Sequence, residues 1–175
     1  IFAYKGDKYN WGKLKESVDL ISYRGPDNSH YDNISNDVLF AFHRLAIMGV
    51  TISGDQPMKH PHDESLTLIC NGEIYNYKDL AERYDFNLTT GSDCEIILYL
   101  YQKFGIERTI KDLDGVFMFV LHDASSDQLF ASRDPIGVRP GFIGIKEDEL
   151  FIASEAKPLV QLCETVLPFP PGTWW

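Results

Sequence analysis

The sequence lacks the features of disulfide-rich, metal-binding and membrane-spanning proteins. Its 175 residues include only three cysteines, which are odd in number and widely spaced: Cys70, Cys94 and Cys163. Neither Cys-x-x-Cys nor His-Glu-x-x-His occurs, so we expect no disulfide framework and no metal site. No apolar run approaches the roughly 20 residues that span a bilayer, and the N-terminus soon turns charged, unlike a signal peptide. We therefore expect a cytoplasmic protein.

Positive charge is also scarce. Sixteen lysines and arginines stand against 26 aspartates and glutamates, which gives a formal net charge of −10. An acidic surface repels phosphate groups, so nucleic acid and anionic membranes are poor partners. The length and the hydrophobic content of 44% fit one globular domain that spans residues 1–175.

Short apolar runs between turn signals predict most of the secondary structure. We expect strands at 38–45, 66–70, 116–121, 128–132, 141–145 and 150–153, and helices at 14–21, 76–84, 93–104 and 156–162. Asn76 is the expected cap of one helix, and Ser92 or Asp93 the cap of the next. Val116 to Leu121 is continuously apolar, as in a strand buried on both faces. The late strands suggest an antiparallel meander, and the whole pattern predicts an α+β layered sandwich.

The first candidate functional segment ends the strand at 38–45. Burying an arginine such as Arg44 is costly unless its guanidinium has a partner, and its planar fork suits a carboxylate. The alternatives for Arg44 are an internal salt bridge or an exposed strand end. We expect the neighbouring His43 to be packed and hydrogen-bonded rather than a catalytic base.

Two further segments carry polar groups beside apolar runs. Asn71-Gly72 follows a strand and predicts either a turn or an oxyanion hole, made by the asparagine amide and a glycine N–H. Asp93 predicts either a helix cap or a carboxylate that binds a substrate ammonium group. A carboxylate binder, an ammonium binder and an oxyanion hole together fit an amino acid attacked at its side-chain carbonyl, namely glutamine or asparagine. Cys70 and Cys94 are expected to be inert core thiols.

The chain resembles the N-terminal glutaminase domain of glutamine-dependent asparagine synthetases, which are class II glutamine amidotransferases. The resemblance covers nearly the whole chain, and the order and spacing of RGPD, NGEIYNY and RDPIGVRP are the most specific part of it. The matching stretches are IFAYKG (1–6), RGPD (24–27), FHRLAI (42–47), QP (56–57), NGEIYNY (71–77), SDCEIILYLYQKFGIE (92–107), LDGVFMFVLHD (113–123), RDPIGVRP (133–140), ASEAK (153–157) and FPPG (169–172).

The resemblance implies an Ntn-hydrolase-like fold, a four-layer αββα sandwich in which two antiparallel sheets lie between helices. It also implies the site. Arg44 would hold the glutamine α-carboxylate, and the backbone of Leu45, Ala46, Ile47 and Met48 would line the pocket. Asn71 and Gly72 would form the oxyanion hole. Glu73 and Asp93 would bind the α-ammonium group.

The printed sequence departs from the family pattern at both ends. In the family a nucleophilic cysteine opens the chain as Cys-Gly-Ile, and its α-amino group, with a pKa of roughly 8, is the expected proton acceptor. The chain starts at Ile1 instead, and we expect no hydrolysis if Ile1 is the true terminus. The family's ATP-dependent synthetase domain, with its phosphate loop, would follow the FPPG stretch. ATP and magnesium would belong to that partner domain, and we expect no cofactor in residues 1–175.

Two alternatives stay open at this point. One is a noncatalytic glutamine-binding domain of the same fold. The other is an amidotransferase module that delivers ammonia to another acceptor. The sequence also leaves open whether the protein forms a homo-oligomer.

Overall fold

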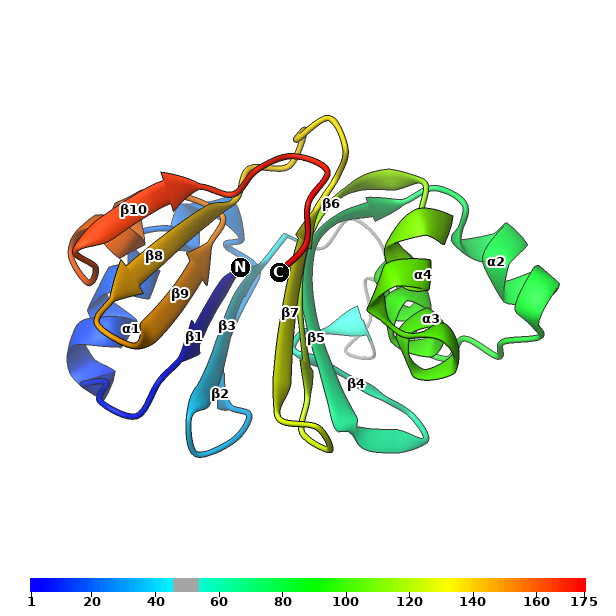
Figure 1. Cartoon of the computed structure of the whole chain (residues 1–175), viewed down its shortest axis with the longest axis horizontal. Coiled ribbons are helices and arrows are strands. Elements are labelled where there is room, and N and C mark those ends of the chain that lie inside the picture. Colours follow the sequence, from blue (N-terminus) through cyan, green and yellow to red (C-terminus); the bar gives the residue numbers. More distant parts are fainter. Residues whose placement is uncertain (46–53) are drawn as a thin grey trace. The chain divides into compact units, whose positions relative to one another are not determined.

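The computed structural model describes residues 1–45 and 54–175, which divide into two compact units (Figure 1). Unit 1 comprises Ile1–Leu45 and Pro140–Pro170, and unit 2 comprises Ala46–Arg139 and Pro171–Trp175. The larger segment of unit 2 therefore interrupts unit 1 along the sequence, and the last five residues of the chain return to unit 2. Each unit is built on one antiparallel sheet with helices.

The sheet of unit 1 has the strand order β10-β8-β9-β1-β3-β2. Alternate residues of its central strands share one face, which packs against Leu14 and Val18 of α1 and Leu159 of α5. This core determines which side of the sheet the helices cover. The elements are β1 (Phe2–Lys5), α1 (Trp11–Asp19), a 3₁₀ turn (Ser22–Arg24), β2 (Asn28–Asn33), β3 (Val38–Arg44), β8 (Phe142–Lys146), β9 (Glu149–Ala153), α5 (Lys157–Val160) and β10 (Thr165–Pro168).

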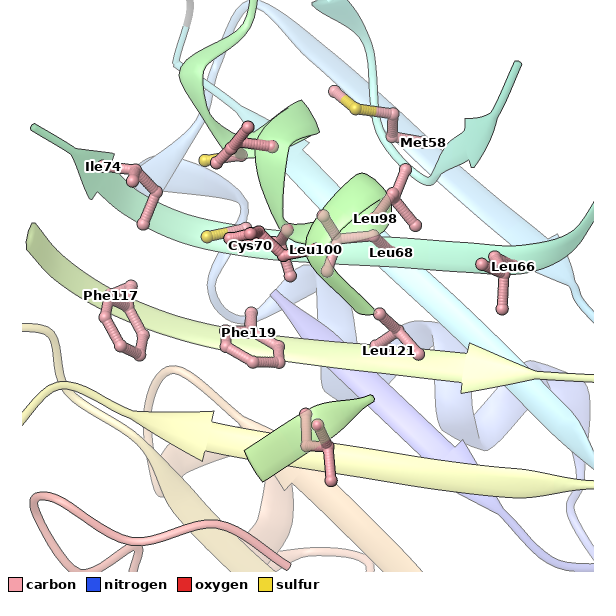
Figure 2. Packing of buried hydrophobic residues seen from close by; sticks show 14 of the residues in the cluster. Met58, Leu66, Leu68, Cys70, Ile74, Leu98, Leu100, Phe117, Phe119 and Leu121 are labelled. Atoms are coloured by element: carbon pink, nitrogen blue, oxygen red, sulfur yellow. The ribbon is translucent and has the colours of Figure 1, made fainter. Parts of the chain in front are cut away.

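The sheet of unit 2 has the strand order β4-β5-β6-β7. Its elements are β4 (Met58–His60), β5 (Asp63–Ile74), α2 (Tyr77–Tyr84), a 3₁₀ turn (Asp93–Glu95), α3 (Ile96–Phe104), α4 (Ile106–Asp112), β6 (Gly115–Asp123) and β7 (Gln128–Arg133). Figure 2 shows Cys70 of β5 and Phe119 of β6 on the face where α3 contributes Leu98 and Leu100. Both Cys70 and Cys94 belong to this core cluster, which confirms them as core residues.

The predicted strands and helices are present, with shifts at their ends. The run Val116–Leu121 lies within β6, where Met118 and Val120 are as fully buried as Phe117 and Phe119 on the opposite face. The expectation of a strand buried on both faces is therefore confirmed. Because both faces of this strand are buried, its sequence is continuously apolar and does not alternate between apolar and polar residues.

The expected late meander is wrong. The strands β6 and β7 pair in unit 2, whereas β8 and β9 pair in the sheet of unit 1. The chain changes sheets in the turn-rich stretch after Arg133, where the backbone folds around Asp134 instead of making another hairpin.

The predicted cap positions are confirmed at Asn76 for α2 and at Ser92 for the 3₁₀ turn before α3, but neither side chain makes a capping hydrogen bond. Asn76 occupies the cap position of α2, but its side chain binds the backbone of Asp112 and Asp114 instead of capping the helix. Neither Ser92 nor Asp93 uses its side chain to cap the 3₁₀ turn that precedes α3. The side chains of Asn76 and Asp93 instead bond backbone groups that are more distant in the sequence. No helix of the described residues has the length and apolarity needed to cross a membrane.

Candidate active site

The segment Asn71–Glu73 lies inside β5, so the turn interpretation of Asn71-Gly72 is wrong. The strand continues to Ile74 and pairs with β6, with Gly72 opposite Phe117. A side chain at Gly72 would collide with the carbonyl oxygen of Val116, so glycine allows the two strands to approach. The neighbouring strand therefore already requires glycine at this position.

The strand places Asn71 and Glu73 on the same face of the sheet. Side chains alternate along a strand, and Cys70 and Ile74 point into the core under the helices. Asn71 and Glu73 therefore point to the opposite face, and both are partly exposed. A polar amide and a carboxylate stand next to each other there, with the Gly72 backbone between them.

Asp93 reaches the end of this strand from the segment before α3. Its Oδ2 accepts a hydrogen bond of 2.6 Å from the backbone N–H of Ile74, and only 5% of the residue is exposed. Burial raises the pKa of the Asp93 carboxyl, and the nearby charge of Glu73 raises this pKa further. Two acids that repel each other in this way favour the binding of a cation.

An arginine that the sequence did not indicate as a site residue contacts Glu73 of this acidic pair. Nη2 of Arg139 lies 3.2 Å from Oε1 of Glu73, and both side chains are partly exposed. The stretch RDPIGVRP carries Arg139, but nothing in that motif indicated a partner 66 residues away. No group of three or more His, Cys, Asp or Glu side chains within residues 1–45 and 54–175 is arranged to hold a metal ion.

The loop that delivers Arg139 folds around a buried carboxylate. Asp134 accepts hydrogen bonds from the backbone N–H groups of Ile136, Val138 and Arg139 at 2.9–3.2 Å. Arg133 closes the loop from the other side by donating to the carbonyl oxygens of Arg139 and Gly137 at 2.7 Å. The position of Arg139 is therefore set by backbone contacts rather than by its own side chain.

Arg44 and His43 end β3 in unit 1. His43 is packed and hydrogen-bonded as expected: Nδ1 lies 2.8 Å from Ser29 Oγ and Nε2 lies 3.1 Å from the Val18 carbonyl oxygen. Burial lowers the pKa of His43, which favours a neutral imidazole. Arg44 is only 8% exposed, so the alternative of an exposed strand end is wrong.

The remaining members of the expected site are divided between the units. Leu45, like Arg44, belongs to unit 1, and its side chain is 56% exposed, as suits a residue expected to contribute only its backbone. Asn71, Gly72, Glu73 and Asp93 lie together in unit 2. Ala46, Ile47 and Met48 lie outside the described residues.

Two motifs without an assigned role meet in unit 1. Arg24 of RGPD donates to Glu155 of ASEAK at 2.9 Å, and Tyr23 donates to the same carboxylate at 2.6 Å. Gly25 follows, where a side chain would collide with the backbone of His43. The RGPD turn therefore packs directly against the end of β3 that carries Arg44.

Comparison with known proteins shows the family to which the chain belongs. The chain belongs to the glutamine amidotransferase domain family, whose model matches residues 1–168. Two solved structures share the fold: the glutamine phosphoribosylpyrophosphate amidotransferase of B. subtilis, at a TM-score of 0.82 and 19% identity, and an allosteric regulatory enzyme of purine biosynthesis, at 0.77 and 18%. Each covers 99% of this chain, which confirms the expected α+β fold, and the chain covers 46% and 45% of theirs.

Relatives with higher sequence identity share one described activity. The chain is 45% identical over 152 residues to the glutamine-hydrolyzing asparagine synthetases of Rattus norvegicus and Homo sapiens, and 42% identical over 153 residues to that of Gallus gallus. These alignments cover 85–86% of this chain. The chain spans 27% of the length of these curated relatives.

Proposed function

We propose that this chain releases ammonia from the side-chain amide of glutamine for an ATP-dependent synthetase domain that amidates aspartate. The observation that carries the proposal is the end of β5, where Asn71 and Gly72 stand beside the acidic pair Glu73 and Asp93. The similarity to glutamine-hydrolyzing asparagine synthetases supports the choice of acceptor. ATP and magnesium act in the synthetase domain, and the cytoplasm is the proposed location.

The side chains divide the work of binding and chemistry. Arg44 binds the α-carboxylate through its planar fork, and the backbone of residues 45–48 lines the pocket. Glu73 and Asp93 bind the α-ammonium group, whose positive charge relieves their mutual repulsion. These contacts fix the side-chain amide beside Asn71 and Gly72.

The nucleophile in this proposal is a cysteine in front of Ile1, in the sequence Cys-Gly-Ile. Its sulfur attacks the amide carbon of glutamine, its proton passes to its own α-amino group, and the carbonyl electron pair moves to oxygen. The Asn71 amide and the Gly72 N–H donate hydrogen bonds to this oxyanion. When the oxyanion collapses, the C–N bond breaks and ammonia leaves with the proton. Water then hydrolyses the thioester to glutamate and restores the thiol.

The first test is intact mass and N-terminal sequencing of the mature protein. A terminus of Cys-Gly-Ile supports hydrolysis. A terminus at Ile1 supports the alternative of a noncatalytic glutamine-binding domain, since the remaining groups only bind and polarise the substrate.

The substrate assignment is tested by Arg44→Ala in protein that carries Cys-Gly before Ile1. We expect the KM for glutamine to rise at least about 30-fold, because a buried charged contact worth roughly 2 kcal/mol or more is lost. The KM is measured from the rate of glutamate release as a function of glutamine concentration. Arg83→Ala, at an exposed arginine of α2, is the matched control and should leave the KM unchanged. An unchanged KM in Arg44→Ala would remove Arg44 from the binding site.

A further inference from the structure

Among residues 1–45 and 54–175, no strand pairs with the outer edge of β5 where the candidate site lies. The register of β4 reaches Leu68 and goes no further along β5, although β5 continues to Ile74. The backbone groups beyond Leu68 on this edge must find other partners. Side chains from elsewhere in unit 2 supply them.

The first of these side chains is Gln56. Its Oε1 accepts from the backbone N–H of Cys70 at 2.6 Å, and its Nε2 donates to the carbonyl oxygen of the same residue at 3.1 Å. The amide therefore makes the pair of bonds that a neighbouring strand would make with one residue. Gln56 is 7% exposed, so both bonds are buried.

Two more side chains follow at alternate residues. Sγ of Cys94 lies 4.0 Å from the carbonyl oxygen of Gly72, and Asp93 accepts from the N–H of Ile74. Because backbone groups alternate between the two edges of a strand, the N–H of Gly72 faces this same outer edge. The backbone of Phe117, opposite Gly72, agrees with this, since its carbonyl oxygen accepts from the N–H of Asp134 on the side away from β5.

We propose that Gln56 is a positioning residue for the oxyanion hole. A strand that continued beside β5 would occupy the N–H of Gly72 and leave no donor for the substrate. One glutamine amide instead fixes the backbone at Cys70 and leaves the N–H of Gly72, two residues further on, for the oxyanion. The inference rests on the proposed function, because it gives Gln56 a role only if Gly72 is an oxyanion donor.

The test compares Gln56→Met with the matched control Gln102→Met in protein that carries Cys-Gly before Ile1. Methionine keeps the length of glutamine and removes both bonds. Gln102 is exposed and bonds Asp63 at the far end of β5, so the control removes a glutamine bond from the same strand. Hydrolysis of glutamine gives kcat and KM, and hydrogen exchange followed by mass spectrometry reports on residues 66–74.

For Gln56→Met we expect kcat to fall about 10- to 100-fold while the KM changes less than about threefold, because an oxyanion donor acts mainly in the transition state. Exchange at residues 70–74 should quicken about tenfold or more, with residues 66–68 unchanged. The control should alter neither the kcat nor this exchange. Gln56→Asn, which keeps the amide but shortens it, should move kcat and exchange in the same direction and serves if Gln56→Met does not fold.

The outcomes separate the two proposals. Unaltered kcat with faster exchange at residues 70–74 would overturn the positioning role of Gln56, and so would an equal loss of activity in the control. Absence of hydrolysis in the unsubstituted protein would instead overturn the proposed function.

Discussion

Two regions of unit 2 are built around buried aspartates, and the two carboxyl groups behave in opposite ways. Asp134, in the loop of residues 133–139, is 1% exposed, and Asp93, before α3, is 5% exposed. Burial alone would raise the pKa of both groups. The pKa of Asp134 is nevertheless lowered, because the backbone N–H groups of its loop stabilise the charge, whereas the pKa of Asp93 is raised.

The balance between backbone hydrogen bonds and opposing causes explains the difference between the two pKa shifts. Asp134 accepts from several backbone N–H groups of a loop that closes around it. Burial and the charge of Glu73 raise the pKa of Asp93 and outweigh the backbone N–H groups of Ile74, Cys94 and Asp93 itself, which lower this pKa. A carboxylate whose acceptor sites are filled stabilises the fold, whereas a buried carboxylate beside a second acid destabilises it until a cation binds. This contrast agrees with the proposed binding role of Asp93 and with a structural role for Asp134.

The largest expected effect is that of Asp134→Ala. Removing the carboxylate leaves four backbone N–H groups, including that of Phe117, without their acceptor, and hydrogen bonds to a charged group contribute about 1.5–3 kcal/mol each. We expect a loss of roughly 3 kcal/mol or more in the free energy of unfolding, measured with urea at pH 7. Asp79→Ala, at an exposed position of α2, should cost less than about 1 kcal/mol.

The pH dependence of this first effect follows from the lowered pKa. The stabilisation by Asp134 is present above the ordinary carboxyl value of 3.8 and disappears as the pH falls through the lower folded value. The difference in the free energy of unfolding between Asp134→Ala and the unsubstituted chain should therefore become smaller at acidic pH. A loss below about 1 kcal/mol at pH 7 would contradict the structural role.

The opposite result is expected for Asp93→Asn. A raised folded pKa means that the native state binds the proton more tightly than the unfolded chain, so the ionised carboxylate destabilises the protein at pH 7. Asparagine can still accept from Ile74 but carries no charge. We expect the variant to be more stable than the unsubstituted chain at pH 7, and the gain to vanish as the pH is lowered toward 3.8.

The same variant should bind glutamine more weakly. Urea unfolding at two pH values measures the stability, and the KM for glutamine measures the binding. A variant that loses stability at pH 7 would place Asp93 with Asp134 among the structural acids.

The smallest effect is expected for Arg139→Met. The ion pair with Glu73 joins side chains that are 31% and 43% exposed, so its contribution is about 0.5 kcal/mol and is screened by salt. The Nε of Arg139 is buried and has no hydrogen-bond partner among the described residues, which offsets part of that contribution. Urea unfolding in low and high salt checks this. A loss above about 2 kcal/mol would show that Arg139 holds the loop together.

The sequence predicted the long strands and the longer helices with apolar periodicity, but it missed the short buried strand β1, the helix α4 and the strands β2, β4 and β10. Strand β2 is polar and largely exposed, and β4 has only three residues. Such edge strands are held by a neighbour that is already in place, β3 for β2 and β5 for β4, so their own residues carry little signal.

Apart from β1, the sequence by itself determined which runs become buried strands, and it determined that His43 would be packed, because burial follows from hydrophobic spacing. It also offered Asn71, Gly72 and Asp93 as candidate members of one site, whereas Glu73 entered only through a family resemblance. The tertiary structure alone decided which groups these side chains contact. Gln56 meets Cys70, Asp93 meets Ile74 and Arg139 meets Glu73 across 14, 19 and 66 residues. Such bonds have no local pattern, since each depends on a strand edge or a loop that exists only when the sheet has formed.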